Sequence, residues 1–194
     1  EGIRSMMRQD PDIILVGEIR DKETAEMAFA AAMTGHQVYS TLHTNSAIGA
    51  IPRLLDIGVL GDIMSGNIIG IIAQRLVRKL CTSCREAHVA DEIERKLLGL
   101  PVDSGPQTLY RPVGCDHCAH QGYKGRIAII ELLKMTPALD EMVARRASSR
   151  ELKTAAANSG FHSLIDDGVR RVLEGVTTLE EVGRVVDLTE RLAN

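Results

Sequence analysis

Aromatic residues are scarce in this sequence: they make up 3% of its 194 residues, and tryptophan is absent. The core must therefore be built from aliphatic side chains, chiefly Ile, Leu, Val, Ala and Met. Scarce aromatics also argue against a surface that stacks the bases of single-stranded nucleic acid. The formal net charge of −3 gives no general attraction for nucleic acid. We therefore expect no nucleic-acid partner.

Long apolar runs are missing as well. None approaches the length of about 18 residues that a membrane-spanning helix needs, because Asn67 and Arg75 interrupt the most apolar region. The first residues do not have the pattern of a signal peptide. We expect a cytoplasmic protein without a membrane span, whose contact with a membrane comes through a partner. The length suits one domain, or one domain with an appendage.

A short apolar run near the start of the chain is bounded by charged residues. Asp10-Pro11-Asp12 precedes Ile13-Ile14-Leu15-Val16, and Gly17-Glu18-Ile19-Arg20-Asp21 follows it. Four apolar residues between a proline and a glycine predict a strand buried on both faces, as in a parallel sheet covered by helices. A carboxylate just after such a strand lies where α/β sheets bind ligands. Glu18 is therefore a candidate site residue, although an isolated acid there can equally pair with Arg20 or cap a turn.

The next segment predicts a helix and a second strand. Asp21 is a candidate N-cap, and Gly35 ends an apolar stripe formed by Ala25, Ala28, Phe29 and Ala32. Residues 37–42 then predict a strand that is followed by His43. Because consecutive strands of a β-α-β unit end at one edge of the sheet, we expect His43 to lie near Glu18. The other histidine of this segment, His36, is by its residue type alone more typical of a hydrogen-bonded support for the loop.

Together these residues resemble the ring-forming secretion ATPases, the family that drives type II protein secretion and type IV pilus assembly. In that family, Asp-Pro-Asp-(apolar)4-Gly-Glu-Ile-Arg-Asp is the Walker B segment, which here is residues 10–21. Thr-Gly-His…Ser-Thr-Leu-His-Thr-Asn is the histidine box, which here is residues 34–45. The resemblance continues almost to the C-terminus. It implies an α/β fold, namely the C-terminal part of a RecA-like P-loop ATPase core, with ATP and Mg²⁺ as cofactors.

The resemblance also implies roles for single residues. Glu18 would lie beside the magnesium-bound nucleotide and help to position the attacking water, and His43 would sense the terminal phosphate. A further set would lie at nucleotide sites or subunit interfaces: Arg4, Arg8, Arg20, His36 and Arg53. A guanidinium can hold phosphate through two parallel hydrogen bonds. Without the resemblance, a solvated basic face is the commoner fate of Arg4 and Arg8.

The only four cysteines form two C-x2-C pairs, Cys81 with Cys84 and Cys115 with Cys118. Two such pairs complete the tetrahedral sulfur shell that a structural zinc ion prefers. Disulfides are disfavoured in a reducing cytoplasm, and a redox pair needs only one C-x2-C. His88, His117 and His120 are close enough in sequence to replace a ligand, but four cysteines already fill the shell. The pattern therefore predicts a structural zinc site.

The remaining segments predict further helices. Residues 46–80 look helical in pieces, and we expect a later helix there to bury Ile68, Ile71, Ile72 and Leu76, with Arg75, Arg78 and Lys79 near its end. Between the cysteine pairs, residues 91–100 predict a short charged helix and residues 101–112 a surface excursion. Residues 122–126 predict a turn before a strand at 127–133. Capping-box starts at Ser148, Ser163 and Thr178, with Gly160 and Gly175 as stops, then predict a helical tail.

One motif of these ATPases is missing: the sequence has no G-x-x-x-x-G-K-[ST] loop. That loop holds nucleotide phosphates, and in the family it lies upstream. We therefore expect a C-terminal piece that is inactive alone. Its expected domains are the second half of the ATPase core at 1–80, a zinc-binding module at 81–120, and a strand followed by a helical subdomain at 121–194.

Two function classes follow from these patterns. The first is a hexameric ring ATPase that powers type II secretion, contacts the cytoplasmic domain of an inner-membrane platform protein and so lies at that membrane. Pilus assembly is its alternative, although residues 163–168 and 177–182 look more like the secretion branch. The second class is a zinc-stabilised interaction module that docks a membrane partner. A phosphate loop upstream of this sequence would favour the ATPase.

Overall fold

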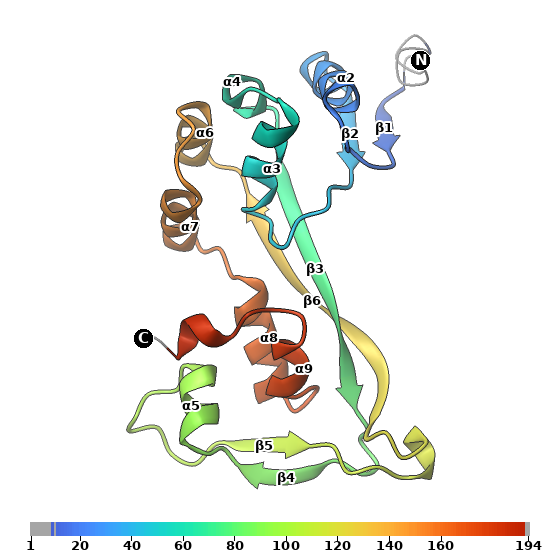
Figure 1. The fold of residues 1–194 in the computed structure, drawn as a ribbon, viewed down its shortest axis with the longest axis vertical. Helices are drawn as coiled ribbons and strands as arrows, with labels where there is room; N and C mark the ends of the chain where they lie inside the picture. The colour runs from blue at the N-terminus through green and yellow to red at the C-terminus, as the bar shows by residue number, and fades with distance from the viewer. Residues whose placement is uncertain (1–8, 10, 193–194) are drawn as a thin grey trace. The chain divides into compact units, whose positions relative to one another are not determined.

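The computed structural model describes residue 9 and residues 11–192, and it shows a mixed α/β fold (Figure 1). The chain forms two compact units. The first comprises Glu1–Ala73 and Leu132–Phe161, and the second comprises Gln74–Glu131 and His162–Asn194. Two paired strands, β3 (Gly70–Leu80) and β6 (Tyr123–Lys134), carry the chain from the first unit to the second and back. Arg4 and Arg8 lie outside the described residues.

The first unit begins with a β-α-β motif, as predicted. Strand β1 (Ile13–Val16) pairs in parallel with β2 (Gln37–Ser40), from Ile13 opposite Gln37 to Val16 opposite Ser40. Helix α2 (Lys22–Met33) connects them, and the side chain of Asp21 caps it by accepting a hydrogen bond from the Thr24 N–H at 2.8 Å. Its buried core comprises Ile14, Val16, Ala28 and Ala31, against which Ile19 and Val38 pack. The motif therefore fixes where the carboxyl ends of both strands lie.

The expectation that β1 is buried on both faces is wrong. Ile14 and Val16 are buried, whereas Ile13 and Leu15 are 59% and 72% exposed. Successive side chains of a strand point to opposite faces, so α2 covers only one of them. An unbroken apolar run indicates two buried faces only where both faces have a cover in the same chain.

The rest of the first unit is mainly helical. It contains α3 (Ala50–Ile57), α4 (Gly61–Met64), α6 (Pro137–Ala144) and α7 (Ser149–Asn158). Helix α4 lies against the end of α6, so close that a Cβ on Gly61 would come within 2.5 Å of the Val143 carbonyl oxygen. The Gly66 N–H donates to the Asp140 carboxylate at 2.9 Å. Helix α7 begins with the predicted capping box of Ser148 and Glu151.

The predicted later helix of residues 46–80 is wrong, because Gly70–Leu80 is strand β3. Its buried residues are Ala73, Val77 and Leu80, and their spacing of four and then three positions fits one face of a helix. The pairing of β3 with β6 selects the strand. Arg75, Arg78 and Lys79 therefore lie on a strand and not at the end of a helix.

The second unit combines a hairpin with short helices. Strand β4 (Glu86–Val89) pairs antiparallel with β5 (Thr108–Arg111), and α5 (Glu92–Leu98) begins with a capping box of Asp91 and Glu94. The 3-10 helix η1 (Asp116–Cys118) precedes β6, while α8 (Leu164–Leu173), α9 (Leu179–Gly183) and the 3-10 helix η2 (Thr189–Arg191) follow. The core comprises Ala90, Leu98, Leu109, Val169, Val172, Val182 and Leu188.

A buried carboxylate joins α9 to β3 within the second unit. Glu181 is 1% exposed, and it accepts hydrogen bonds from the Arg78 N–H at 2.9 Å and from the Arg78 guanidinium at 2.6 Å. Arg184 donates two further bonds, at 3.1 and 3.2 Å. Burial alone would raise the pKa of Glu181, but the Arg78 and Arg184 hydrogen bonds outweigh it and lower the pKa to about 2. Thr178 caps α9 as predicted, with its side chain accepting from the Glu181 N–H.

The helical tail has the predicted starts and stops. Ser163 and Asp166 form a reciprocal capping box at α8, and Gly160 and Gly175 follow α7 and α8 with positive φ angles. Among the residues that the structure describes, no helix has the length and apolar character needed to cross a membrane.

Candidate functional site

The carboxyl ends of β1 and β2 bring Glu18 and His43 together, as the strand order predicted. Glu18 follows β1 by two residues, and His43 follows β2 by three. The His43 Nε2 atom lies 2.9 Å from the Glu18 Oε1 atom. The Glu18 side chain is 19% exposed and that of His43 is 87% exposed. An imidazole and a carboxylate thus meet at the edge where parallel sheets bind ligands.

The second oxygen of Glu18 also has a cationic partner. The Arg20 Nε atom donates to the Glu18 Oε2 atom at 2.5 Å, and the Arg20 side chain is 75% exposed. Both partners of the carboxylate are therefore flexible side chains in contact with solvent. Such side chains can turn from the carboxylate to an incoming phosphate, because imidazole and guanidinium groups both donate hydrogen bonds to phosphate oxygens.

The loops that carry Glu18 and His43 are also joined through a residue that the sequence analysis did not single out. The Thr41 hydroxyl donates to the Gly17 carbonyl oxygen at 2.6 Å. The Ile19 N–H donates to the Thr41 carbonyl oxygen at 3.0 Å. In the sequence, Thr41 lies within the predicted strand at 37–42 and within the histidine box at 34–45. These bonds flank Glu18 on both sides.

The remaining predicted site residues of the first unit lie elsewhere. His36 is at the start of β2, where its Nδ1 atom lies 3.1 Å from the Ala31 carbonyl oxygen and 3.1 Å from the Thr34 hydroxyl. This is a hydrogen-bonded turn at the opposite end of the strand from His43. Arg53 lies exposed on α3. The structure therefore groups Glu18, His43 and Arg20, and it does not bring His36 to them.

The four cysteines of the second unit form one cluster. All four sulfur atoms lie within 4.8 Å of one another. Measured pairs are Cys81 to Cys115 at 3.9 Å, Cys84 to Cys118 at 3.8 Å and Cys115 to Cys118 at 3.9 Å. Sulfur atoms at about 2.3 Å from a tetrahedral zinc ion are separated by about 3.8 Å. The cluster therefore fits a zinc ion, with each cysteine supplying one ligand.

Backbone N–H groups surround these sulfur atoms. Gly114 donates to the Cys84 sulfur, and Cys115 and Gly122 donate to the Cys118 sulfur, each at 3.2 Å. Burial would raise the pKa of Cys118, but the donors from Cys115 and Gly122 outweigh it and lower that pKa to about 6. Burial raises the pKa of Cys115 to about 11. The lowered pKa of Cys118 favours its thiolate, the form that binds metal.

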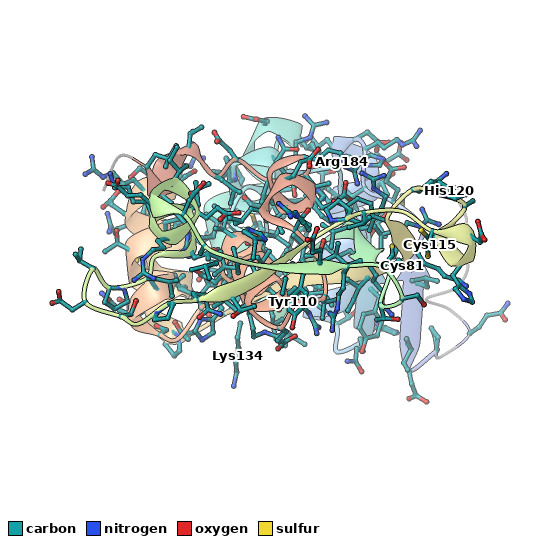
Figure 2. The ribbon with its side chains drawn as sticks, turned by 90° about the horizontal axis from the view of Figure 1, so that it is seen from below. Cys81, Tyr110, Cys115, His120, Lys134 and Arg184 are labelled. Atoms are coloured by element: carbon teal, nitrogen blue, oxygen red, sulfur yellow. The ribbon has the colours of Figure 1, made fainter. Side chains whose placement is uncertain are left out.

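A glycine is required where the second cysteine pair meets β6. Gly122 has a φ angle of +74°, and a Cβ there would come within 2.4 Å of the Pro112 Cβ. Two of the three histidines near the cluster have other partners: His120 pairs with Asp116 at 3.1 Å and His88 with Glu94 at 2.9 Å. Figure 2 shows Cys81 close to Cys115, with His120 on the loop beyond. Among the described residues, the metal-ligand cluster consists of the four cysteines alone.

Comparison with known proteins gives consistent matches along the whole chain. The sequence model of the family described as type II/IV secretion system protein matches residues 1–184. The chain is 51% identical over 184 residues to type II secretion system protein E of Pseudomonas aeruginosa, a match that covers 95% of this chain and 36% of the relative. It is 49% identical over 189 residues to type IV pilus assembly ATPase PilB of the same organism, a match that covers 95% of this chain and 33% of the relative. The chain thus spans about a third of these relatives.

Solved structures share the fold at lower sequence identity. The ATPase DotB of Legionella pneumophila matches 95% of this chain and 41% of its own, with a TM-score of 0.62 and 22% identity. DotB of Yersinia pseudotuberculosis matches 96% of this chain and 40% of its own, with a TM-score of 0.65 and 20% identity. At this identity the likeness concerns the fold alone.

Proposed function

Because this chain belongs to the type II/IV secretion system protein family, we propose that it is the C-terminal part of a cytoplasmic ring ATPase that powers type II protein secretion. The observation that carries the proposal is the pairing of Glu18 with His43 at 2.9 Å, at the carboxyl ends of two parallel strands. Because ligands bind at this edge in α/β sheets, Glu18 and His43 lie where a nucleotide can reach them.

The two side chains have complementary chemistry for hydrolysis. Glu18 orients the attacking water and accepts its proton, a task for which a carboxylate at a strand end is suited. His43 donates a hydrogen bond to the terminal phosphate, where negative charge must be stabilised in the transition state. Arg20 donates to the second Glu18 oxygen and can turn from it to a phosphate of the bound nucleotide. Mg²⁺ bound with ATP would supply charge neutralisation at the phosphates.

The proposal requires a phosphate-binding loop that this sequence does not contain. We propose that the complete protein provides it, and that this chain alone hydrolyses little or no ATP. Residues 1–80 then form the second half of a RecA-like core, residues 81–120 a zinc-binding module, and residues 121–194 a strand with a helical subdomain. The zinc ion would be structural, held by Cys81, Cys84, Cys115 and Cys118.

A ring would complete each nucleotide site with a neighbouring subunit. We propose a homo-oligomer, a hexamer, in which Arg4, Arg8 and Arg53 lie at subunit interfaces or nucleotide sites. His36 belongs to the same proposed set, although its bonds to Ala31 and Thr34 favour a supporting role. The ring would act at the cytoplasmic face of the inner membrane through a platform protein.

Pilus assembly is the second candidate, because pilus relatives are almost as similar. Identity is 51% to the secretion protein and 49% to PilB of Pseudomonas aeruginosa, a difference too small to separate the branches. Deleting the gene and assaying both secreted proteins and surface pili separates them. Loss of secretion with normal pili supports type II secretion, and the reverse result supports pilus assembly.

The ATPase itself is tested with the complete protein, including the segment that carries the phosphate loop. Purified protein should release phosphate from ATP when Mg²⁺ is present and not when EDTA replaces it. A complete protein that binds no nucleotide and releases no phosphate, at any protein concentration that allows a ring to form, would overturn the proposal.

A further inference from the structure

We propose that Thr41 is the positioning residue of the hydrolytic site, holding Glu18 where it faces His43. The inference rests on the proposed ATPase function and adds a residue to it. Thr41 touches the backbone on both sides of Glu18 and lies two residues before His43 in the chain. One residue therefore determines how the two loops approach each other.

The bonds of Thr41 extend the β1–β2 pairing past the ends of the strands. The ladder ends where Val16 lies opposite Ser40. Beyond it, the Thr41 hydroxyl donates to the Gly17 carbonyl at 2.6 Å, and the Ile19 N–H donates to the Thr41 carbonyl at 3.0 Å. Glu18 lies between these two anchored residues. Its backbone is thus fixed while its carboxylate still contacts exposed side chains.

This arrangement matters because the partners of Glu18 do not fix it themselves. The His43 and Arg20 side chains are both largely exposed, so they leave the carboxylate when they turn to a phosphate. The position of Glu18 must then come from its backbone, and the hydroxyl bond of Thr41 is one of the two bonds that hold it. A misplacement of about 1 Å at a reacting group costs up to about 100-fold in rate.

A purely structural role for the hydroxyl makes a different prediction. Thr41 is exposed, so replacing its hydroxyl by a methyl group leaves no buried cavity and no buried unpaired group. The bond between Ile19 and Thr41 uses the backbone and persists in every variant. Thr41→Val should therefore change the free energy of unfolding by only about 1 kcal/mol, the net value of one hydrogen bond. If the hydroxyl were only structural, the folded variant would hydrolyse ATP as fast as wild type. A lower kcat in folded protein therefore isolates the positioning role.

The test compares steady-state kinetics of the complete ATPase and its variants. Thr41→Val should lower kcat about tenfold, which corresponds to about 1.4 kcal/mol, with the KM for ATP within about twofold of wild type because ground-state binding is unchanged. Thr41→Ser keeps the hydroxyl and should restore kcat. Thr154→Val is the matched control: it removes the hydroxyl of another exposed threonine, which donates to the Arg150 carbonyl oxygen at 3.1 Å on α7, and kcat should stay at the wild-type value.

A double-mutant cycle shows whether Thr41 acts through Glu18. In a Glu18→Gln background, Thr41→Val should cause no further loss, because the group that it positions is already disabled. A full additional tenfold loss there, or a kcat for Thr41→Val equal to wild type, would overturn the role of Thr41 while leaving the ATPase intact. Failure of Thr41→Ser to restore kcat would overturn it too. A wild-type protein without ATPase activity would instead overturn the proposed function, and this inference with it.

Discussion

The two units differ in the kind of group that forms hydrogen bonds to their ionisable side chains. In the first, the Glu18 carboxylate is partnered by His43 and Arg20, whose side chains are exposed and flexible. In the second, the cysteine sulfurs and the Glu181 carboxylate accept hydrogen bonds from backbone N–H groups, and Glu181 is buried. A side-chain partner can leave when a ligand arrives, whereas a backbone donor cannot leave without local unfolding.

Glu18 and Glu181 make this difference clear because both are glutamates with two basic partners. Arg20 and His43 face Glu18, and Arg78 and Arg184 face Glu181. Only Glu181 also accepts a bond from the backbone of a neighbouring strand, the Arg78 N–H. Pairing with cations therefore does not identify a catalytic carboxylate. The exposure of the partners and the lack of a backbone donor from another element distinguish Glu18, the proposed catalytic residue, from Glu181.

The largest expected effect is loss of the metal. Cys84→Ser should lower bound zinc from about one ion per chain to almost none, since a structural site uses all four ligands. Zinc binding contributes about 10 to 16 kcal/mol to the folding of isolated zinc fingers, so residues 81–118 should lose their order. Elemental analysis gives the zinc content, and hydrogen exchange shows which segment opens. Strands β1 and β2 should keep their protection, because their own apolar core holds them.

Ser83→Ala is the matched control for the metal, because it changes the adjacent residue and keeps all four sulfurs. It should bind zinc like wild type. The prediction of a closed zinc site is contradicted if wild-type protein contains no zinc, or if its cysteines react with thiol reagents in the native state as fast as in urea.

Glu18→Gln should have the largest effect on chemistry. In the complete protein, kcat should fall about 100- to 10,000-fold, the range for removing a group that transfers a proton in the transition state. The Kd for ATP should change little, because the phosphate loop provides most of the binding. Glu23→Gln, an exposed acid in the first turn of α2, is the control and should be as active as wild type. Equal turnover in wild type and Glu18→Gln would remove Glu18 from the mechanism.

Local signals in the sequence were enough for the first unit's β-α-β motif and for most helix starts. Asp21, Ser148 and Ser163 cap the helices that they were predicted to cap. The contact between Glu18 and His43 followed from the rule that parallel strands end at one edge. The clustering of the four cysteines followed from their spacing. Each of these inferences needs only near neighbours in sequence, or one general rule of topology.

Features that depend on partners far along the chain could not be predicted in the same way. Ala73 and Val77 fit a helix or a strand, and only pairing with β6 decides between them. Exposure of Ile13 and Leu15 depends on which surfaces the rest of the protein covers, which composition does not reveal. The role of Thr41 depends on the register that places Val16 opposite Ser40. For two strands of four residues each, the apolar pattern alone does not fix that register.

His43→Ala should have a smaller effect on turnover than Glu18→Gln. We expect kcat to fall about 30-fold. This reduction is smaller than the one expected for loss of a fully enclosed hydrogen-bond donor to the developing charge, because the His43 side chain is exposed to solvent. His36→Ala is the comparison: loss of its bonds to Ala31 and Thr34 should lower the melting temperature and leave kcat unchanged. A larger fall in kcat for His36→Ala than for His43→Ala would reverse the two assignments.

The smallest expected effect is the acid sensitivity that Glu181 confers. Burial opposes its charge, but hydrogen bonds from Arg78 and Arg184 lower its pKa from the usual 4.5 to about 2. The folded protein therefore holds this carboxylate ionised at a pH where the unfolded chain is protonated. The stability that the ion cluster contributes is fully present above pH 4.5 and is lost as the pH falls towards 2.

The size of this effect follows from the same two pKa values. Their difference sets an upper limit of about 3.5 kcal/mol, at about 1.4 kcal/mol for each pKa unit. Arg78 and Arg184 are about half exposed, so solvent weakens the interaction, and we expect about 1 to 2 kcal/mol. Urea unfolding between pH 6 and pH 3 measures it. Because other groups of the protein also gain protons in this range, the informative quantity is the difference in free energy of unfolding between wild type and Glu181→Gln. This difference in the free energy of unfolding should shrink as the pH falls. If it stays constant, the Glu181 carboxylate is not the group that titrates.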